Sequence, residues 1–96
     1  MERYKAIPGV EMTSFGNEYY LVKARKLAED GTNCLLRMNG VSAFYWTLLG
    51  EWRTKEELLS ELPKAYDVPD EEIARKDLDI LLDNWMMAGC VEKGIG

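Results

Sequence analysis

With 96 residues, of which 47% are hydrophobic and 30% charged, the chain has the length and composition of one globular domain. It contains no histidine and only two cysteines, Cys34 and Cys90, which excludes a disulfide framework and opposes metal binding or His-dependent acid–base catalysis. The net charge of −5 is concentrated in residues 51–96, where twelve acidic and six basic residues make a poor surface for nucleic acid.

We expect neither a targeting nor a membrane segment. No apolar run approaches the roughly 20 residues of a membrane span, and the first residues, MERYKAIPG, lack the apolar core of a signal peptide. The prediction is a cytoplasmic protein, folded as a single domain over residues 1–96 with flexible ends at 1–9 and 93–96. In a reducing cytosol we expect the two cysteines to be small buried side chains rather than a bridge.

Three strands are predicted before residue 39, where hydrophobic residues alternate with polar ones. The segments between them contain Pro-Gly, Gly-Asn and Glu-Asp-Gly, which are typical of turns and hairpins. The predicted strands are Val10–Phe15, Glu18–Leu27 and Asn33–Met38. Consecutive strands with short connections favour a three-stranded antiparallel meander.

After Met38 the hydrophobic period changes from 2 to 3.6, which predicts three helices and an α+β fold. Asn39 is the expected N-cap of the first helix. Gly50 is placed to end that helix in the left-handed region. Its expected apolar face consists of Val41, Phe44, Tyr45, Leu48 and Leu49.

The second helix is predicted to begin at a capping box formed by Thr54 and Glu57. Pro63 cannot donate a backbone hydrogen bond, so we expect this helix to kink or shorten at Leu62. The side chains expected to face inward are Leu58, Leu59, Leu62 and Tyr66.

The third helix is predicted to begin at the acidic segment 69–72 and to end at Ala88-Gly89. Its main buried stripe is expected to consist of Ala74, Leu78, Leu81, Leu82, Trp85 and Ala88. Ile73, Ile80 and Met87 form a second apolar stripe with a spacing of seven residues. Two interpretations of it remain open: the helix is buried on two sides, or the second stripe lines a groove for a partner.

Six short motifs occur along the chain in a characteristic order: Met38-Asn39, Tyr45-Trp46, Glu51-Trp52-Arg53-Thr54, Tyr66-Asp67-Val68, residues 77–82 and Gly89-Cys90-Val91. This series resembles the PqqD-like family, whose members recognise ribosomally made peptides that are later modified (RiPP recognition elements). The resemblance covers roughly residues 10 to 92. Three positions depart from the family pattern: Glu51 replaces a glycine, Tyr45 replaces an aliphatic residue, and Pro63 interrupts the second helix.

This resemblance implies a winged-helix-like fold and a non-catalytic binding role without a cofactor. The leader segment of a precursor peptide would add as a strand to the third strand and be presented to a modifying enzyme, often a radical-SAM protein. An unpaired strand edge suits such addition, because its free N–H and C=O groups pair with an extended peptide. The expected peptide-binding residues are Asn33, Cys34, Leu35, Leu36, Arg37, Met38, Ile73, Leu78, Ile80, Leu81 and Trp85.

Two other functions remain open from the residues alone. A winged-helix DNA-binding domain fits the element order, but the acidic third helix opposes it. A homo-oligomeric interaction domain fits an exposed strand edge and a two-sided helix, so both a monomer and a homodimer are compatible with the sequence. An enzyme is disfavoured because the sequence offers no nucleophile–base pair.

Several single residues have two interpretations each. Arg37 either pairs with an acidic leader residue or protects the strand edge as a solvated charge. Lys23, Arg25 and Lys26 are typical of a solvated sheet face. Trp52 either packs in the domain or docks a partner, since tryptophan is enriched at interfaces.

Overall fold

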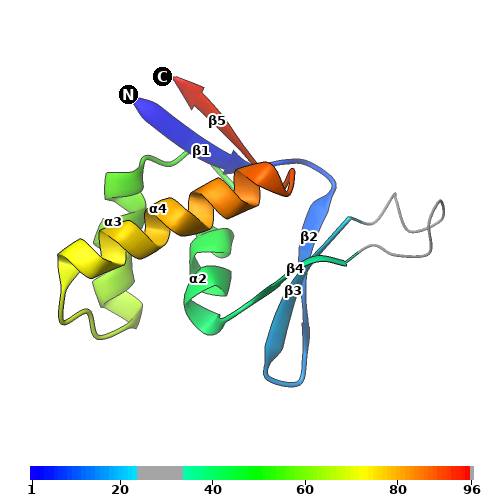
Figure 1. Cartoon of the computed structure of the whole chain (residues 1–96), viewed down its shortest axis with the longest axis horizontal. Helices are drawn as coiled ribbons and strands as arrows, with labels where there is room; N and C mark the ends of the chain where they lie inside the picture. Colours follow the sequence, from blue (N-terminus) through cyan, green and yellow to red (C-terminus); the bar gives the residue numbers. More distant parts are fainter. Residues whose placement is uncertain (24–33, 96) are drawn as a thin grey trace.

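The computed structural model of the chain describes residues 1–23 and 34–95, which form two small antiparallel sheets and three helices (Figure 1). The element order is β1, β2, β3, β4, α2, α3, α4 and β5. The predicted α+β class with a three-stranded meander followed by three helices is confirmed. No helix in these two ranges has the length and apolar character needed to cross a membrane.

The three-stranded sheet has the order β2–β3–β4. Its strands are Val10–Phe15, Glu18–Lys23 and Cys34–Met38. Phe15 pairs with Glu18 across the two-residue turn Gly16-Asn17, and Gly16 has a φ of 66°, a conformation that glycine adopts without steric cost. The expected extension of the second strand to Leu27, the hairpin turn at 29–31, Arg25, Lys26 and Asn33 lie outside the described residues.

A second sheet joins the two ends of the chain, and neither of its strands is predicted from the sequence. β1 (Glu2–Ala6) pairs antiparallel with β5 (Val91–Ile95), and Tyr4 N–H and C=O also exchange hydrogen bonds of 2.7 and 2.9 Å with Arg53. The ends that we expected to be flexible therefore contain a paired ladder. The pairing of β1 with β5 is hard to predict from the sequence because each strand is short and rich in charged residues. The two strands are brought together only by the fold of the residues between them.

Helix α2 (Gly40–Leu48) begins as predicted, with Asn39 Oδ1 accepting the Ser42 N–H at 2.8 Å. The prediction for its end is wrong: the C-cap is Leu49, and Gly50 is not in the left-handed region. The buried face also differs from the predicted one, because Trp46 is 8% exposed whereas Val41 is 36% exposed. Trp46 faces inward because its ring packs edge to face against Trp85 of α4.

Helix α3 (Lys55–Ala65) has the predicted capping box: Glu57 N–H donates to Thr54 Oγ1 at 3.1 Å, and Thr54 N–H donates to Glu57 Oε1 at 2.8 Å. The helix continues through Pro63 to Ala65, so the expected shortening at Leu62 does not occur. Pro63 lies in the last turn, where its missing N–H removes one hydrogen bond and the chain leaves the helix two residues later.

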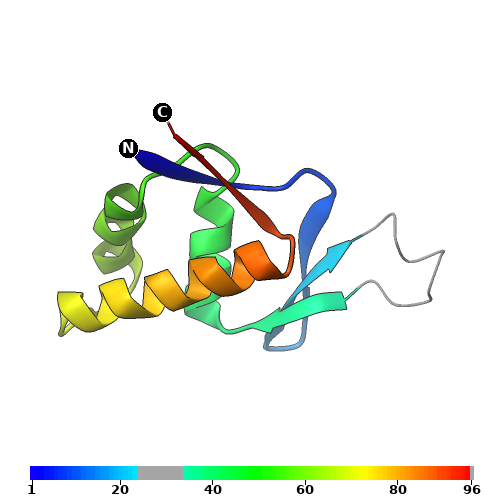
Figure 2. The same cartoon turned by 45° about the horizontal axis from the view of Figure 1, so that its top comes forward.

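Helix α4 (Glu71–Met87) is capped at its start by Asp70, whose carboxylate accepts the N–H groups of Glu72 and Ile73 at 3.0 and 3.2 Å. It ends at Ala88, and Gly89 follows with a φ of 76°, as predicted for its terminus. Figures 1 and 2 show α4 crossing α2, with its C-terminal end next to the three-stranded sheet.

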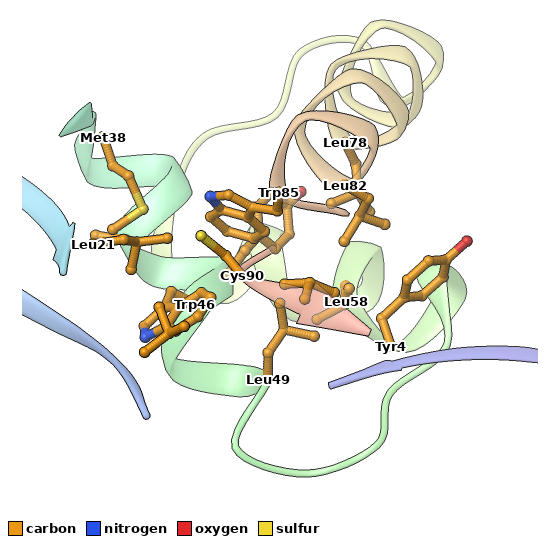
Figure 3. Packing of buried hydrophobic residues seen from close by; sticks show 14 of the residues in the cluster. Tyr4, Leu21, Met38, Trp46, Leu49, Leu58, Leu78, Leu82, Trp85 and Cys90 are labelled. Carbon is orange, nitrogen blue, oxygen red and sulfur yellow. The ribbon is translucent and has the colours of Figure 1, made fainter. Parts of the chain in front are cut away.

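One buried cluster connects both sheets and all three helices. Figure 3 shows Trp85 of α4 at its centre, with Cys90 beside it and Met38 and Leu21 of the three-stranded sheet on one side. The rings of Trp85 and Trp46 meet edge to face with centroids 5.4 Å apart. The expectation that Cys90 is a buried side chain is confirmed, since it is 0% exposed.

Candidate functional site

The outer edge of β4 is the first part of the candidate site. β4 pairs with β3 on one side, and no described strand pairs with its other side. Leu36 is partly buried, Arg37 is exposed and Met38 is 7% exposed. The Met38 side chain therefore anchors the strand in the core. For Cys34 and Leu35 the structure describes the strand backbone but not the side chains.

Arg37 has an acidic neighbour within its own sheet. Its Nη1 lies 3.6 Å from Glu18 Oε1, and both side chains are largely exposed. An ion pair between exposed side chains contributes little to stability in water. The Arg37 guanidinium can therefore exchange Glu18 for another partner. The structure thus shows how Arg37 is placed in the free protein, while its role toward a ligand stays a prediction.

The predicted residues of α4 separate into two groups. Leu78 and Trp85 are 1% and 0% exposed and belong to the core, so neither side chain presents a surface to a partner in this structure. Leu81 is partly buried against the same cluster. Ile73 and Ile80 are 57% and 61% exposed. The second stripe is therefore at the surface, and the interpretation that α4 is buried on two sides is wrong.

We call Ile73, Asp77, Ile80, Asn84 and Met87 the α4 stripe, because their spacing of four and three residues places them on one face of the helix. All five are exposed, and Met87 is 87% exposed although it was left out of the predicted site. An exposed row of large apolar side chains on one helix face is the surface feature that most often marks a binding site.

The direction of the α4 stripe follows from the contacts of the opposite flank. Arg75 Nη2 donates to Glu56 Oε2 at 2.9 Å, and Asp79 Oδ1 lies 2.6 Å from Lys55 Nζ, so that flank faces α3. The stripe lies on the other flank, and its residues Ile73 and Asp77 line a cavity together with Val41 and Tyr45 of α2. Figure 2 shows the end of β4 near the C-terminal end of α4, before the chain enters α2. That the β4 edge and the α4 stripe border one groove stays a prediction.

A cavity of about 310 Å³ lies at the N-terminal end of the α4 stripe, and we call it the α2–α4 cavity. Ile73 and Asp77 line it from α4, and Val41 and Tyr45 line it from α2. The apolar spacing of α2 predicts that Tyr45 faces inward, and this residue is not among the predicted site residues. A larger hollow of about 720 Å³ lies between α3 and α4, next to the Arg75–Glu56 ion pair and away from the stripe.

The polar side chains of this surface are a tyrosine hydroxyl and several aspartate carboxylates. Burial, and secondarily the charge of Asp77, raises the pKa of Tyr45, so its hydroxyl keeps its proton at neutral pH. Among the described residues, no group of three or more His, Cys, Asp or Glu side chains is arranged to hold a metal ion. The arrangement offers a strand edge that no described strand pairs with, a helix face with exposed apolar side chains and a cavity with acidic residues.

Comparison with known proteins gives two matches. The family model described as Coenzyme PQQ synthesis protein D (PqqD) matches residues 27–91. The structure of TbiB1 in complex with the TbiA(beta) leader peptide is similar in fold, with a TM-score of 0.69 and 23% sequence identity. That similarity covers 96% of this chain and 98% of the TbiB1 chain. No curated protein sequence matches the chain.

Proposed function

This chain belongs to the PqqD family, and we propose that it is a recognition element that binds the leader segment of a ribosomally made precursor peptide. The leader would add as a strand to the outer edge of β4 and lay alternate side chains against the α4 stripe. The similar fold of TbiB1, whose structure contains a leader peptide, supports this proposal. In this family the partner that then modifies the peptide is often a radical-SAM enzyme, and the domain itself needs no cofactor.

The observation that carries the proposal is the exposure of Ile73, Ile80 and Met87 beside a sheet edge that no described strand pairs with. Backbone pairing supplies affinity that is independent of side chains, and an apolar row selects which leader residues fit. Because Leu78 and Trp85 are buried, they support α4 from beneath, and the contact falls to the α4 stripe.

A binding titration tests the function. The full chain is titrated by calorimetry with a synthetic leader peptide from the precursor encoded beside its gene, and we expect saturable binding with a Kd of ~50 µM or tighter. Ile80→Asp is expected to weaken binding by about tenfold, which corresponds to about 1.4 kcal/mol. Ile95→Asp is the matched control, since Ile95 is 86% exposed on the other sheet. No saturable binding by the folded protein would contradict the proposal.

Amide hydrogen exchange tests the mode of binding. On addition of the leader, amides of Cys34–Met38 are expected to gain protection, while those of Val10–Phe15 remain unchanged. β2 is the opposite edge of the same sheet, so it is an internal control. Protection confined to β2, or to neither edge, would contradict strand addition to β4.

The same exposed surface also suits self-association. If the α4 stripe mediates a homodimer, light scattering will show a mass that rises with concentration and falls to that of a monomer in Ile80→Asp. A monomer over the whole concentration range would leave the peptide as the occupant of this surface.

A further inference from the structure

The α2–α4 cavity continues the α4 stripe into the body of the domain. Its walls are largely apolar and include Val41 of α2, Val68 of the α3–α4 connection and Ile73 of α4. Ile73 belongs both to the stripe and to the cavity, so a peptide that follows the stripe toward the N-terminal end of α4 reaches the cavity mouth. With about 310 Å³, the cavity has room for one long side chain.

The polar part of the cavity is acidic. Asp67, Asp70 and Asp77 contribute to its lining, and no lysine or arginine does. The Asp70 carboxylate is engaged as the N-cap of α4. Asp67 and Asp77 form no ion pair with any residue in the described ranges, so their charges are available to a cation.

Tyr45 adds a second and independent feature. Its side chain lines the cavity although the residue is only 2% exposed, and its hydroxyl oxygen is buried without a hydrogen-bond partner among the described residues. A buried hydroxyl without a partner is unfavourable, and most such groups in proteins are paired. Tyr45 and Asp77 line the same cavity.

We propose that the α2–α4 cavity receives one lysine or arginine side chain of the bound leader peptide. Its aliphatic stem lies along Val41 and Ile73, and its charged head reaches Asp77 and the Tyr45 hydroxyl. This inference rests on the proposed function and names a specificity determinant within it. A long side chain with an apolar stem and a cationic head matches both parts of the lining. A metal ion does not, since the described acidic residues form no metal-binding group.

The test is a double-substitution experiment on peptide and protein. Each basic residue of the synthetic leader is replaced in turn by glutamine, which keeps a polar side chain and removes the charge. Each peptide is titrated against the wild-type chain and against Asp77→Asn. At one position, glutamine is expected to weaken binding to the wild type about tenfold, or about 1.4 kcal/mol, and to leave binding to Asp77→Asn nearly unchanged.

Two further variants separate binding from folding. Asp83→Asn removes a charge from the same helix outside the cavity and is expected to leave the affinity unchanged. Tyr45→Phe removes the hydroxyl that has no partner, so the melting temperature of the free protein is expected to hold or rise while leader affinity falls about threefold.

The outcomes distinguish this inference from the function on which it rests. If the leader binds saturably but no basic position is coupled to Asp77, the inference is wrong and the proposed function stands. The same holds if a leader without lysine or arginine binds. If the folded wild-type chain binds no leader at all, the proposed function fails and the inference fails with it.

Discussion

Lys55 Nζ lies 2.6 Å from Asp79 Oδ1, so the first residue of α3 is joined to the middle of α4. The same ammonium group lies 5.8 Å from the ring centroid of Tyr4 on β1. The hydrogen bond to Asp79 is the main reason that the pKa of Lys55 is raised above its usual value. One side chain therefore links two helices with the sheet that closes the chain ends.

Lys55→Met is expected to lower the free energy of unfolding at pH 7 by about 1 kcal/mol, because the pair is partly exposed and reinforced by the tyrosine ring. Since the folded-state pKa of Lys55 is raised, its contribution is complete below the usual value of 10.5 and is lost as the pH rises through the folded value. Urea unfolding at several pH values measures this difference. Lys64→Met, which removes a pair within α3, is the control, with an expected loss below ~0.5 kcal/mol.

Leu78→Ala and Ile80→Ala separate structural from binding residues on α4. Leu78 is 1% exposed, so its truncation is expected to cost about 2–4 kcal/mol of unfolding free energy. Ile80 is 61% exposed, and its truncation is expected to change stability by less than ~0.5 kcal/mol. Denaturant unfolding followed by circular dichroism compares them. Equal losses would show that Ile80 is buried in solution, for example in a dimer.

Thr54→Ala removes one half of the capping box at the start of α3. Thr54 is 6% exposed and its hydroxyl accepts the Glu57 N–H, so the expected loss is about 1 kcal/mol. Thermal unfolding measures it. Thr54→Ser keeps the hydroxyl and is expected to recover most of the stability; recovery by serine no better than by alanine would contradict a capping role.

Glu57→Gln tests the electrostatic half of the same capping box. The hydrogen bond from the Thr54 N–H lowers the pKa of Glu57 below its usual value. A lowered pKa stabilises the fold above pH 4.5 and loses that effect as the pH falls through the folded value. The melting temperature of the wild type is therefore expected to exceed that of Glu57→Gln near pH 7 and to converge with it as the pH falls through the folded-state pKa. A difference that persists in acid would contradict this origin.

Gly89→Ala is expected to destabilise the domain by about 1–2 kcal/mol, because Gly89 has a φ of 76° at the end of α4, where an alanine side chain is strained. Gly50→Ala is the matched control. Gly50 is outside the left-handed region and has nothing within 4 Å of an added Cβ, so that substitution is expected to be neutral or slightly stabilising. Urea unfolding of both variants measures the contrast.

The local features of the fold follow from short stretches of sequence. Asn39, Thr54 with Glu57, and Gly89 each act through hydrogen bonds or dihedral angles within a few residues. These features can be predicted from the sequence, because the hydrogen-bond donors and acceptors that pair with one another lie only a few residues apart in the chain. The β2–β3 hairpin is predictable for the same reason, since the turn fixes its register.

The candidate site was predictable only in part. The sequence indicates an edge strand and predicts the main buried stripe of the last helix, which is confirmed for Leu78, Leu82 and Trp85. It leaves open whether the second stripe is buried as well, because that depends on where α2, α3 and the sheets lie around α4, and the structure exposes Ile73 and Ile80. The α2–α4 cavity was not predicted, because its residues come from three separate segments.

By itself, the sequence determined the types and order of the elements from β2 to α4, the N-terminal caps of α2 and α3, the end of α4 at Gly89 and the family resemblance, because these depend on propensities and contacts between close neighbours. The tertiary structure decided what depends on distant partners: the pairing of β1 with β5, the continuation of α3 through Pro63, and the exposed side of α4. A helix with two apolar faces satisfies the hydrophobic effect with either face inward. Only the packing of the whole chain decides whether the second face is covered as well, and here it leaves Ile73, Ile80 and Met87 exposed.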